Sequence, residues 1–321
     1  MTNSENLAPP SLPPAKKPSR FLSQWRKEWK KNYFIYLILL PIVLYYIAFH
    51  YLPMYGVTIA WKRFTPSKGI WGSTWVGWTN FMSFFKSYYF WRLLKNTLLI
   101  NFYELLFGFP APIILALLLN EIKDGLFKRA AQTISYLPHF ISTVIICGML
   151  VDFLSTDGLV NSILSVIGVS PNAWLRVPEA FRAIYVGSGI WQGVGWGSII
   201  YLASLSNVDP QLYDAAFIDG ANRWKRLWNV TIPSILPTII IMLILRLGHI
   251  MSVGAEKIIL LYNPTTYVTA DVISSFVYRR GLLESDYSFS TAVGLFNSVI
   301  NYTFLFIANA ISRRVSETSL W

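Results

Sequence analysis

Six long apolar stretches constrain this chain more than any other feature of its sequence. A helix of about 20 apolar residues crosses the roughly 30 Å hydrocarbon layer of a membrane. We place the stretches at 33–51, 97–119, 134–154, 183–205, 234–254 and 289–311. Charged residues make up only 13% of the chain, about half the fraction typical of soluble domains. The sequence therefore predicts an all-α integral membrane protein with about six transmembrane helices.

The segment before the first stretch is rich in proline and in basic residues. Its seven basic residues are Lys16, Lys17, Arg20, Arg26, Lys27, Lys30 and Lys31. A basic segment next to a span favours the cytoplasmic side and contacts anionic lipid, and no motif accompanies it that would indicate nucleic-acid binding. Its polar start also differs from a cleavable signal peptide. We predict a cytoplasmic tail over 1–32, a membrane domain over 33–321, and both termini in the cytoplasm.

The segment between the fourth and fifth stretches, over 207–233, is polar but has the pattern of folded structure. Asp209 followed by Pro210 is typical of a helix start, because the carboxylate caps free N–H groups and proline suits the first helical position. The residues up to Asp219 fit a short amphipathic helix, with Leu212, Ala215, Ala216 and Ile218 available for burial. Gly220 suits a bend, since it has no Cβ. A second short helix is expected over 222–230.

This segment resembles the EAA loop of permease subunits from binding-protein-dependent ABC importers. Asp214, Ala215 and Ala216 stand at the Glu-Ala-Ala positions, Gly220 at the glycine, and Val230, Ile232 and Pro233 at the closing positions with the family spacing. The departures are Asp for Glu, Val for Ile and Ile for Leu. Further runs resemble the sugar-permease subgroup, closest to the branch for oligosaccharides and polysaccharide fragments; they are NTLLIN, ALLLNE, YLPHFIS, YRRGL and TAVGLFNSVIN.

The resemblance implies one half of a two-subunit pore, with a second permease subunit that we expect to be a different chain. It also implies two ATPase subunits and an extracytoplasmic solute-binding protein that delivers a carbohydrate. Asp214, Ala215, Ala216, Asp219, Gly220 and Pro233 are then the residues expected to couple the pore to the ATPase. The chain has no Walker phosphate loop, so we expect ATP hydrolysis by the partner and no enzyme activity or cofactor here.

Polar residues inside the spans are candidates for the substrate pathway, because they are costly in a membrane. We name Arg246, Trp191, Gln192, Asn297 and His249. Aromatic faces and planar polar groups suit a sugar, and a mid-membrane arginine suits an acidic one. The alternative for Arg246 is structural, as a partner of Glu104 or of backbone carbonyls. The three histidines are scattered over different spans, which argues against a metal site.

Three alternatives to sugar import follow from the sequence. The same machine can import another solute, such as a polyamine or a peptide. An ion-coupled secondary transporter would need intramembrane acids and would have no use for a coupling loop of this type. A membrane-embedded enzyme would show clustered His, Asp or Glu inside the spans. The aromatic residues over 52–96 leave two interpretations open, an interfacial belt or a docking platform.

Overall fold

The computed structural model describes the backbone of residues 20–315 and the side chains of 29–313. The chain divides into two compact units, residues 1–57 and residues 58–321, which we describe separately. In the described residues the only strands are β1 (Lys62–Arg63) and β2 (Thr74–Trp75), which pair antiparallel. The prediction of an all-α protein is confirmed by the helices that form nearly all the rest.

The first unit is a single long helical segment. It consists of α1 (Arg20–Tyr46), one π-helical turn (Ile47–Tyr51) and α2 (Leu52–Met54). α1 is kinked at Asn32, where φ is −119°, and the predicted first span begins one residue later. Of the predicted tail, residues 1–19 lie outside the described residues and residues 20–32 are helical. The candidate span that contains this helix, Trp29–Trp61, has a mean hydropathy of 2.0, which suits a membrane-spanning segment.

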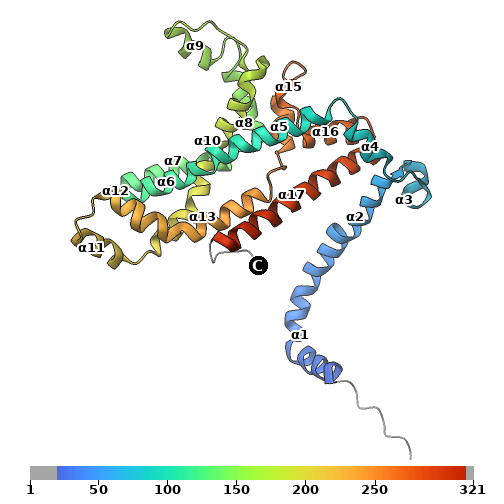
Figure 1. The fold of residues 1–321 in the computed structure, drawn as a ribbon, viewed down its shortest axis with the longest axis horizontal. Coiled ribbons are helices and arrows are strands. Elements are labelled where there is room, and N and C mark those ends of the chain that lie inside the picture. Colours follow the sequence, from blue (N-terminus) through green and yellow to red (C-terminus); the bar gives the residue numbers. More distant parts are fainter. Residues whose placement is uncertain (1–19, 316–321) are drawn as a thin grey trace, which may run out of the picture. The chain divides into compact units, whose positions relative to one another are not determined.

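The second unit starts with short elements and continues with long helices (Figure 1). The short elements are a 3-10 helix (Tyr55–Trp61), the two strands, α3 (Gly69–Gly72) and α4 (Thr79–Phe85). The next helices are α5 (Phe90–Tyr103), α6 (Pro110–Glu121), α7 (Leu126–Tyr136), α8 (Thr143–Phe153), α9 (Leu159–Val166) and α10 (Pro178–Ser206). The last are α11 (Pro210–Ile218), α12 (Arg223–Arg226), α13 (Ile232–Leu247), α14 (Ala255–Leu261), α15 (Tyr267–Ala270), α16 (Ile273–Tyr278) and α17 (Tyr287–Val315).

Four helices in the described residues are long and apolar enough to cross a membrane. They run over Trp29–Trp61, Phe90–Glu121, Arg223–Leu247 and Tyr287–Arg313, and correspond to the predicted first, second, fifth and sixth spans. A bent pair formed by α7 and α8 makes a fifth if it is counted as one span. The predicted fourth span lies in α10, which has 29 residues but is not among these helices. Its glycines, tryptophans and Gln192 lower its mean hydropathy.

The predicted third span, 134–154, is broken rather than continuous. α7 ends at Tyr136, a 3-10 turn covers Leu137–Phe140, and α8 starts at Thr143 with the two parts bent by 97°. Pro138 has no N–H to continue the helix, and Ser142 caps α8 by accepting a hydrogen bond from the amide of Ile145. The sequence prediction missed this break because the predicted span includes only the last three residues of α7 and runs on through Pro138 into α8.

The predicted fifth span, 234–254, differs at both ends. The helix starts already at Arg223, because α12 continues through a π-helical turn (Leu227–Thr231) into α13 without a break. The expected separate second helix of the loop is therefore the first part of this membrane helix. At the other end α13 stops at Leu247, and turns lead to α14. Asn301 of α17 supports these turns, since its side chain accepts from the amide of Met251 and donates to the Ser252 hydroxyl.

α10 is the central helix of the second unit and packs against α6, α7 and α13. Its close approach to α7 depends on Gly195. A Cβ at this position would lie 2.0 Å from the carbonyl oxygen of Ser135. A Cβ at Gly197 would lie 3.1 Å from the Pro112 side chain of α6. Small residues thus allow helix backbones to pack closely, as is common in membrane proteins.

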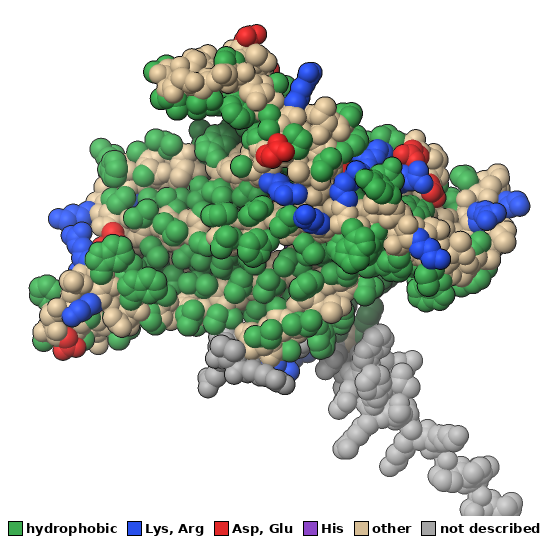
Figure 2. All heavy atoms as spheres, turned by 45° about the horizontal axis from the view of Figure 1, so that its top comes forward, with side chains coloured by type: hydrophobic (Ala, Val, Ile, Leu, Met, Phe, Trp, Pro, Cys, Tyr) green, Lys and Arg blue, Asp and Glu red, His purple; other side chains and the backbone are tan. Residues whose placement is uncertain are grey.

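The surface of the second unit is largely apolar. On the face shown in Figure 2, hydrophobic side chains form a broad band and most charged side chains lie around its margins. Exposed large apolar residues include Leu106, Ile114, Leu118, Val299 and Phe306, from α6, α17 and the turn between α5 and α6. Such a continuous apolar surface is typical of a protein that is covered by lipid or by another membrane subunit.

Candidate functional site

The segment between α10 and α13 folds as a capped helical projection at one end of the long helices (Figure 1). Asp209 caps α11 as expected, with its Oδ1 atom accepting from the amide of Gln211 at 2.9 Å. Asn222 caps α12 by accepting from the amide of Lys225 at 2.9 Å. Each capping side chain accepts from an amide only two or three residues further along the chain, so this geometry follows from local sequence.

Gly220 ends α11 in a left-handed conformation, with φ at +71°. The amide of Ala221 donates to the carbonyl of Ala216 at 2.9 Å, and the amide of Gly220 donates to that of Phe217 at 3.0 Å. These two bonds form a Schellman motif, which satisfies the last carbonyl groups of the helix. The predicted glycine bend therefore has a definite backbone geometry.

The projection is tied to the membrane helix by one polar contact. The Tyr213 hydroxyl donates to the Oγ1 atom of Thr231 at 3.2 Å, and Thr231 is buried in the π-helical turn that leads into α13. A displacement of α11 is thus linked to the start of the membrane helix. This contact joins residues 18 positions apart and was not foreseen from the sequence.

The outer surface of the projection carries exposed apolar side chains beside acidic ones. Phe217 is 70% exposed and Ile218 is 83% exposed, although we expected Ile218 to be available for burial. Leu212 and Ala215 are exposed as well, as are Asp214 and Asp219. The chain itself buries little of this helix, so the expected packing face is free to contact another protein.

A cavity of about 470 Å³ lies beside α10. One wall is the glycine-rich face of α10, where Gly189, Gly193 and Gly197 recur at intervals of four residues. Arg246 and His249 contribute to the wall formed by α13 and the turn that follows it. The lack of side chains on the α10 face is what leaves this space open.

The Arg246 guanidinium forms an ion pair with the Glu104 carboxylate, and both residues line the cavity. The sequence left two interpretations of Arg246, a pathway residue or a partner of Glu104. In the structure Arg246 pairs with Glu104 and also lines the cavity, because the ion pair is itself part of the cavity wall. Glu104 begins a π-helical turn (Glu104–Gly108) between α5 and α6.

The other three pathway candidates occupy different places. Gln192 lines an adjoining hollow at the break between α7 and α8, and its Nε2 atom donates to the carbonyl of Ile141 at 3.2 Å. Gly189 and Gly193 line both this hollow and the main cavity. Trp191 lines two hollows beside α7 and α8 and is not part of the main cavity. Asn297 on α17 lines neither space.

Sequence reasoning missed an aromatic pair next to the hollow that contains Gln192. The rings of His139 and Trp196 stack with 4.6 Å between their centroids and an interplanar angle of 1°. His139 also lines the hollow that contains Gln192. Their pairing depends on the bend between α7 and α8, which the sequence did not reveal. Among the described residues no group of three or more His, Cys, Asp or Glu side chains is placed to hold a metal ion.

A buried lysine near the cavity was also missed. Lys257 on α14 is 9% exposed, and its Nζ atom donates to the carbonyl of Tyr185 at 2.9 Å. Burial lowers the pKa of this ammonium group, while the nearby Cys147 thiol and Glu104 carboxylate oppose the shift. A lysine within the apolar run AEKIILLY was the available signal, but we ended the fifth span before it.

An ion cluster around Asp271 joins distant parts of the second unit. Its carboxylate is fully buried and accepts from Arg279 at 2.7 Å and from Arg92 at 3.4 Å. The Asn96 side chain donates to the carbonyl of Asp271 at 3.0 Å and accepts from Arg182 at 2.8 Å. These contacts connect α5, α10 and the segment around α16, so they fix the frame around the cavity.

Comparison with known proteins identifies the family of this chain. Residues 108–317 match the model of the binding-protein-dependent transport system inner membrane component. Protein LplB of Bacillus subtilis (strain 168) is 42% identical over 89% of this chain and 91% of its own length. The polygalacturonan/rhamnogalacturonan transport system permease protein YteP of the same organism is 40% identical over 90% of each chain.

A solved structure matches the fold over almost its whole length. A chain in the crystal structure of a bacterial ABC transporter involved in the import of the acidic polysaccharide alginate has a TM-score of 0.85 and 45% identity. The match covers 91% of this chain and 99% of that chain. A second matching structure, also with a TM-score of 0.85 and 45% identity, is of a bacterial alginate ABC transporter in complex with an alginate pentasaccharide-bound periplasmic protein.

These findings confirm the resemblance drawn from the sequence and the prediction of a multi-pass membrane protein. They favour a transport subunit over an enzyme or an ion-coupled secondary transporter. The chain therefore belongs to the family of binding-protein-dependent transport system inner membrane components.

Proposed function

We propose that this chain is one half of the pore of an ATP-driven importer that carries acidic oligosaccharides into the cytoplasm. In this proposal a solute-binding protein delivers the sugar, a second permease subunit completes the pore, and an ATPase binds the projection around α11. The observation that carries the proposal is the projection itself, a helix capped at both ends with exposed Phe217 and Ile218 next to Asp214.

The rigidity of the projection fits a role in force transmission. Its caps and the Tyr213–Thr231 hydrogen bond link a docking helix to the start of α13, which carries Arg246 at its other end. A movement imposed on α11 by an ATPase is thereby passed to the helix that lines the cavity. We assign the coupling contact to Asp214, Ala215, Ala216, Asp219, Gly220 and Pro233.

The charge of the cavity favours an acidic sugar. Its wall holds the Arg246–Glu104 pair and His249, and the ammonium of Lys257 lies close behind Gly189. The formal charges of Arg246 and Glu104 cancel, so the Lys257 ammonium leaves one positive charge beside the cavity, which attracts a substrate carboxylate. The relatives named for alginate and for polygalacturonan or rhamnogalacturonan carry polymers that contain uronic acids, which agrees with this assignment.

The test is reconstitution of this chain with its second subunit, ATPase and binding protein in proteoliposomes. We expect ATP-dependent uptake of an oligogalacturonide or an alginate oligosaccharide, and an ATPase rate that rises when loaded binding protein is added. The importer assignment would be refuted if the purified complex contained no ATPase subunit. It would also be refuted if an ion gradient drove uptake when no ATPase was present. Uptake of only neutral sugars or peptides would refute the substrate class.

Two parts of the proposal have separate tests. For the pathway, Arg246→Lys keeps the charge and Arg246→Ala removes it, so only the second should slow uptake strongly if the charge matters. Normal uptake by both assembled variants would exclude Arg246 from the pathway. For topology, a green fluorescent protein at either terminus should fluoresce and an alkaline phosphatase there should be inactive, since both termini are proposed to be cytoplasmic.

A further inference from the structure

Lys257 is a buried cation that the coupling and pathway assignments leave unexplained. Its ammonium group has three N–H donors, and one of them bonds to the carbonyl of Tyr185. The group also lies over the Tyr185 ring, 4.8 Å from its centroid. These contacts are to neutral groups, so they solvate the charge without neutralising it.

No counterion accompanies this charge within the part of the chain that the structure describes. In this part of the chain, no carboxylate oxygen lies within 4.0 Å of the Lys257 ammonium nitrogen to form an ion pair. The adjacent Glu256 is exposed, and Glu104 is paired with Arg246. Burial of a cation without an ion-pair partner is costly, which makes such a residue a candidate for a function.

The ammonium lies directly behind the cavity wall. A Cβ built on Gly189 would be 3.4 Å from Nζ of Lys257, and Gly189 lines both the main cavity and the hollow that contains Gln192. The charge therefore lies next to a residue that lines both spaces and has no side chain of its own. Any larger residue would place apolar atoms next to the ammonium at this point of the wall.

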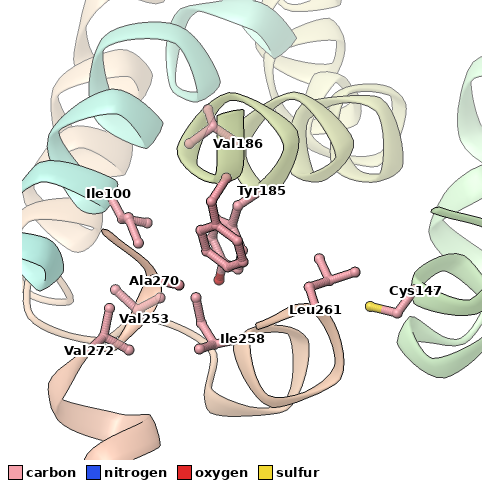
Figure 3. Packing of buried hydrophobic residues seen from close by; sticks show 10 residues of the cluster. Ile100, Cys147, Tyr185, Val186, Val253, Ile258, Leu261, Ala270 and Val272 are labelled. Atoms are coloured by element: carbon pink, nitrogen blue, oxygen red, sulfur yellow. The ribbon is translucent and has the colours of Figure 1, made fainter. Parts of the chain in front are cut away.

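The position of Lys257 is held by packing on the neighbouring residues. Figure 3 shows Ile258 and Leu261 of α14 in one cluster with Tyr185 and Val186 of α10 and Cys147 of α8. Ile258 is fully buried and Leu261 is 3% exposed. Because these side chains share one buried cluster and α14 also packs on α8 and α16, the charge is preorganised and needs little rearrangement when a substrate arrives.

We propose that Lys257 is a specificity-determining residue, a fixed positive charge behind Gly189 that favours oligosaccharides with carboxylates over neutral ones. This inference rests on the proposed function and names a residue that selects among the oligosaccharides the importer carries. Arg246 is less suited to this selection because Glu104 compensates its charge within the same wall. Lys257 forms no ion pair in the described residues, and the low dielectric constant around it strengthens its effect on a nearby carboxylate.

The experiment compares uptake of an oligogalacturonide with uptake of its methyl ester, which has the same length and no free carboxylates. The reconstituted complex is assayed with saturating loaded binding protein. The preference of the binding protein is the same for every variant, so it cancels when the acid-to-ester uptake ratio is compared between variants. We expect Lys257→Met to lower this ratio about tenfold and Lys257→Arg to retain most of it.

Gly189→Ala is a second variant that keeps Lys257 and does not depend on the stability of Lys257→Met. Its methyl group would lie 3.4 Å from the ammonium nitrogen, at a residue that lines the cavity, so we expect the acid-to-ester ratio to fall. Gly187→Ala is the matched control, because its Cβ meets nothing within 4 Å and residue 187 lines a different hollow. Size-exclusion chromatography verifies assembly of each complex.

The outcomes separate this inference from the proposed function. An unchanged ratio in assembled Lys257→Met overturns the role of Lys257 while sugar uptake by the wild type still supports the importer. If Lys257→Met does not assemble, an unchanged ratio in Gly189→Ala overturns it instead. Failure of the wild-type complex to take up either sugar overturns the proposed function, and this inference with it.

Discussion

Substitution of Gly220 by alanine tests whether the end of α11 is held by its backbone geometry. Residue 220 has φ at +71°, and a Cβ there would meet nothing within 4 Å. The substitution therefore adds no clash and acts only through the left-handed conformation, which costs an L-residue about 1–2 kcal/mol. That cost should raise the equilibrium constant for local opening of the helix end about 5- to 30-fold.

Hydrogen exchange measures this opening directly. The amides of residues 220 and 221 make the two capping hydrogen bonds, so exchange of these two amides, followed in a peptide that covers 210–222, should be faster by the same factor. Gly220→Asn should change the rate much less, since asparagine tolerates this conformation better than alanine. Gly125→Ala is a control in another loop, because φ there is 168°, an extended value that any residue adopts.

The functional consequence should follow the structural one. If α11 transmits movement from the ATPase, Gly220→Ala should lower ATPase stimulation by loaded binding protein while the basal rate and the thermal stability of the whole complex change little. Unchanged exchange in Gly220→Ala would show that the capping bonds do not hold the helix end. Faster exchange with full stimulation would refute the need for a rigid projection.

Two further predictions concern stability. Gly195→Ala should prevent normal packing of α7 on α10, because its Cβ would lie 2.0 Å from the Ser135 carbonyl oxygen. We expect a lower melting temperature and a poor yield. Gly148→Ala should behave like the wild type, because its Cβ meets nothing within 4 Å. Asp271→Asn should destabilise the second unit by about 3–5 kcal/mol, since it leaves the Arg279 and Arg92 charges without their shared buried carboxylate. A melting temperature equal to that of the wild type in either variant would contradict the assigned contact.

The sequence by itself determined the features that depend on near neighbours or on length. Apolar stretches predicted the long membrane helices, because burial in lipid requires only enough consecutive apolar residues. Asp209 and Gly220 predicted the start and end of α11, since each acts on amides or carbonyls a few residues away. The break after Tyr136 was missed because the predicted span, 134–154, runs through Pro138 as one apolar stretch.

Only the tertiary structure decided which polar residues meet. The sequence left Arg246 with several possible roles, and the structure pairs it with Glu104, 142 positions away; Lys257 donates to the carbonyl of Tyr185, 72 positions away. Such contacts depend on the rotation and depth of each helix, which helix packing sets and which an apolar stretch leaves undetermined. Trp191 lies outside the main cavity, although Gly189 and Gly193 of the same helix line that cavity. Residues two positions apart on a helix face different directions.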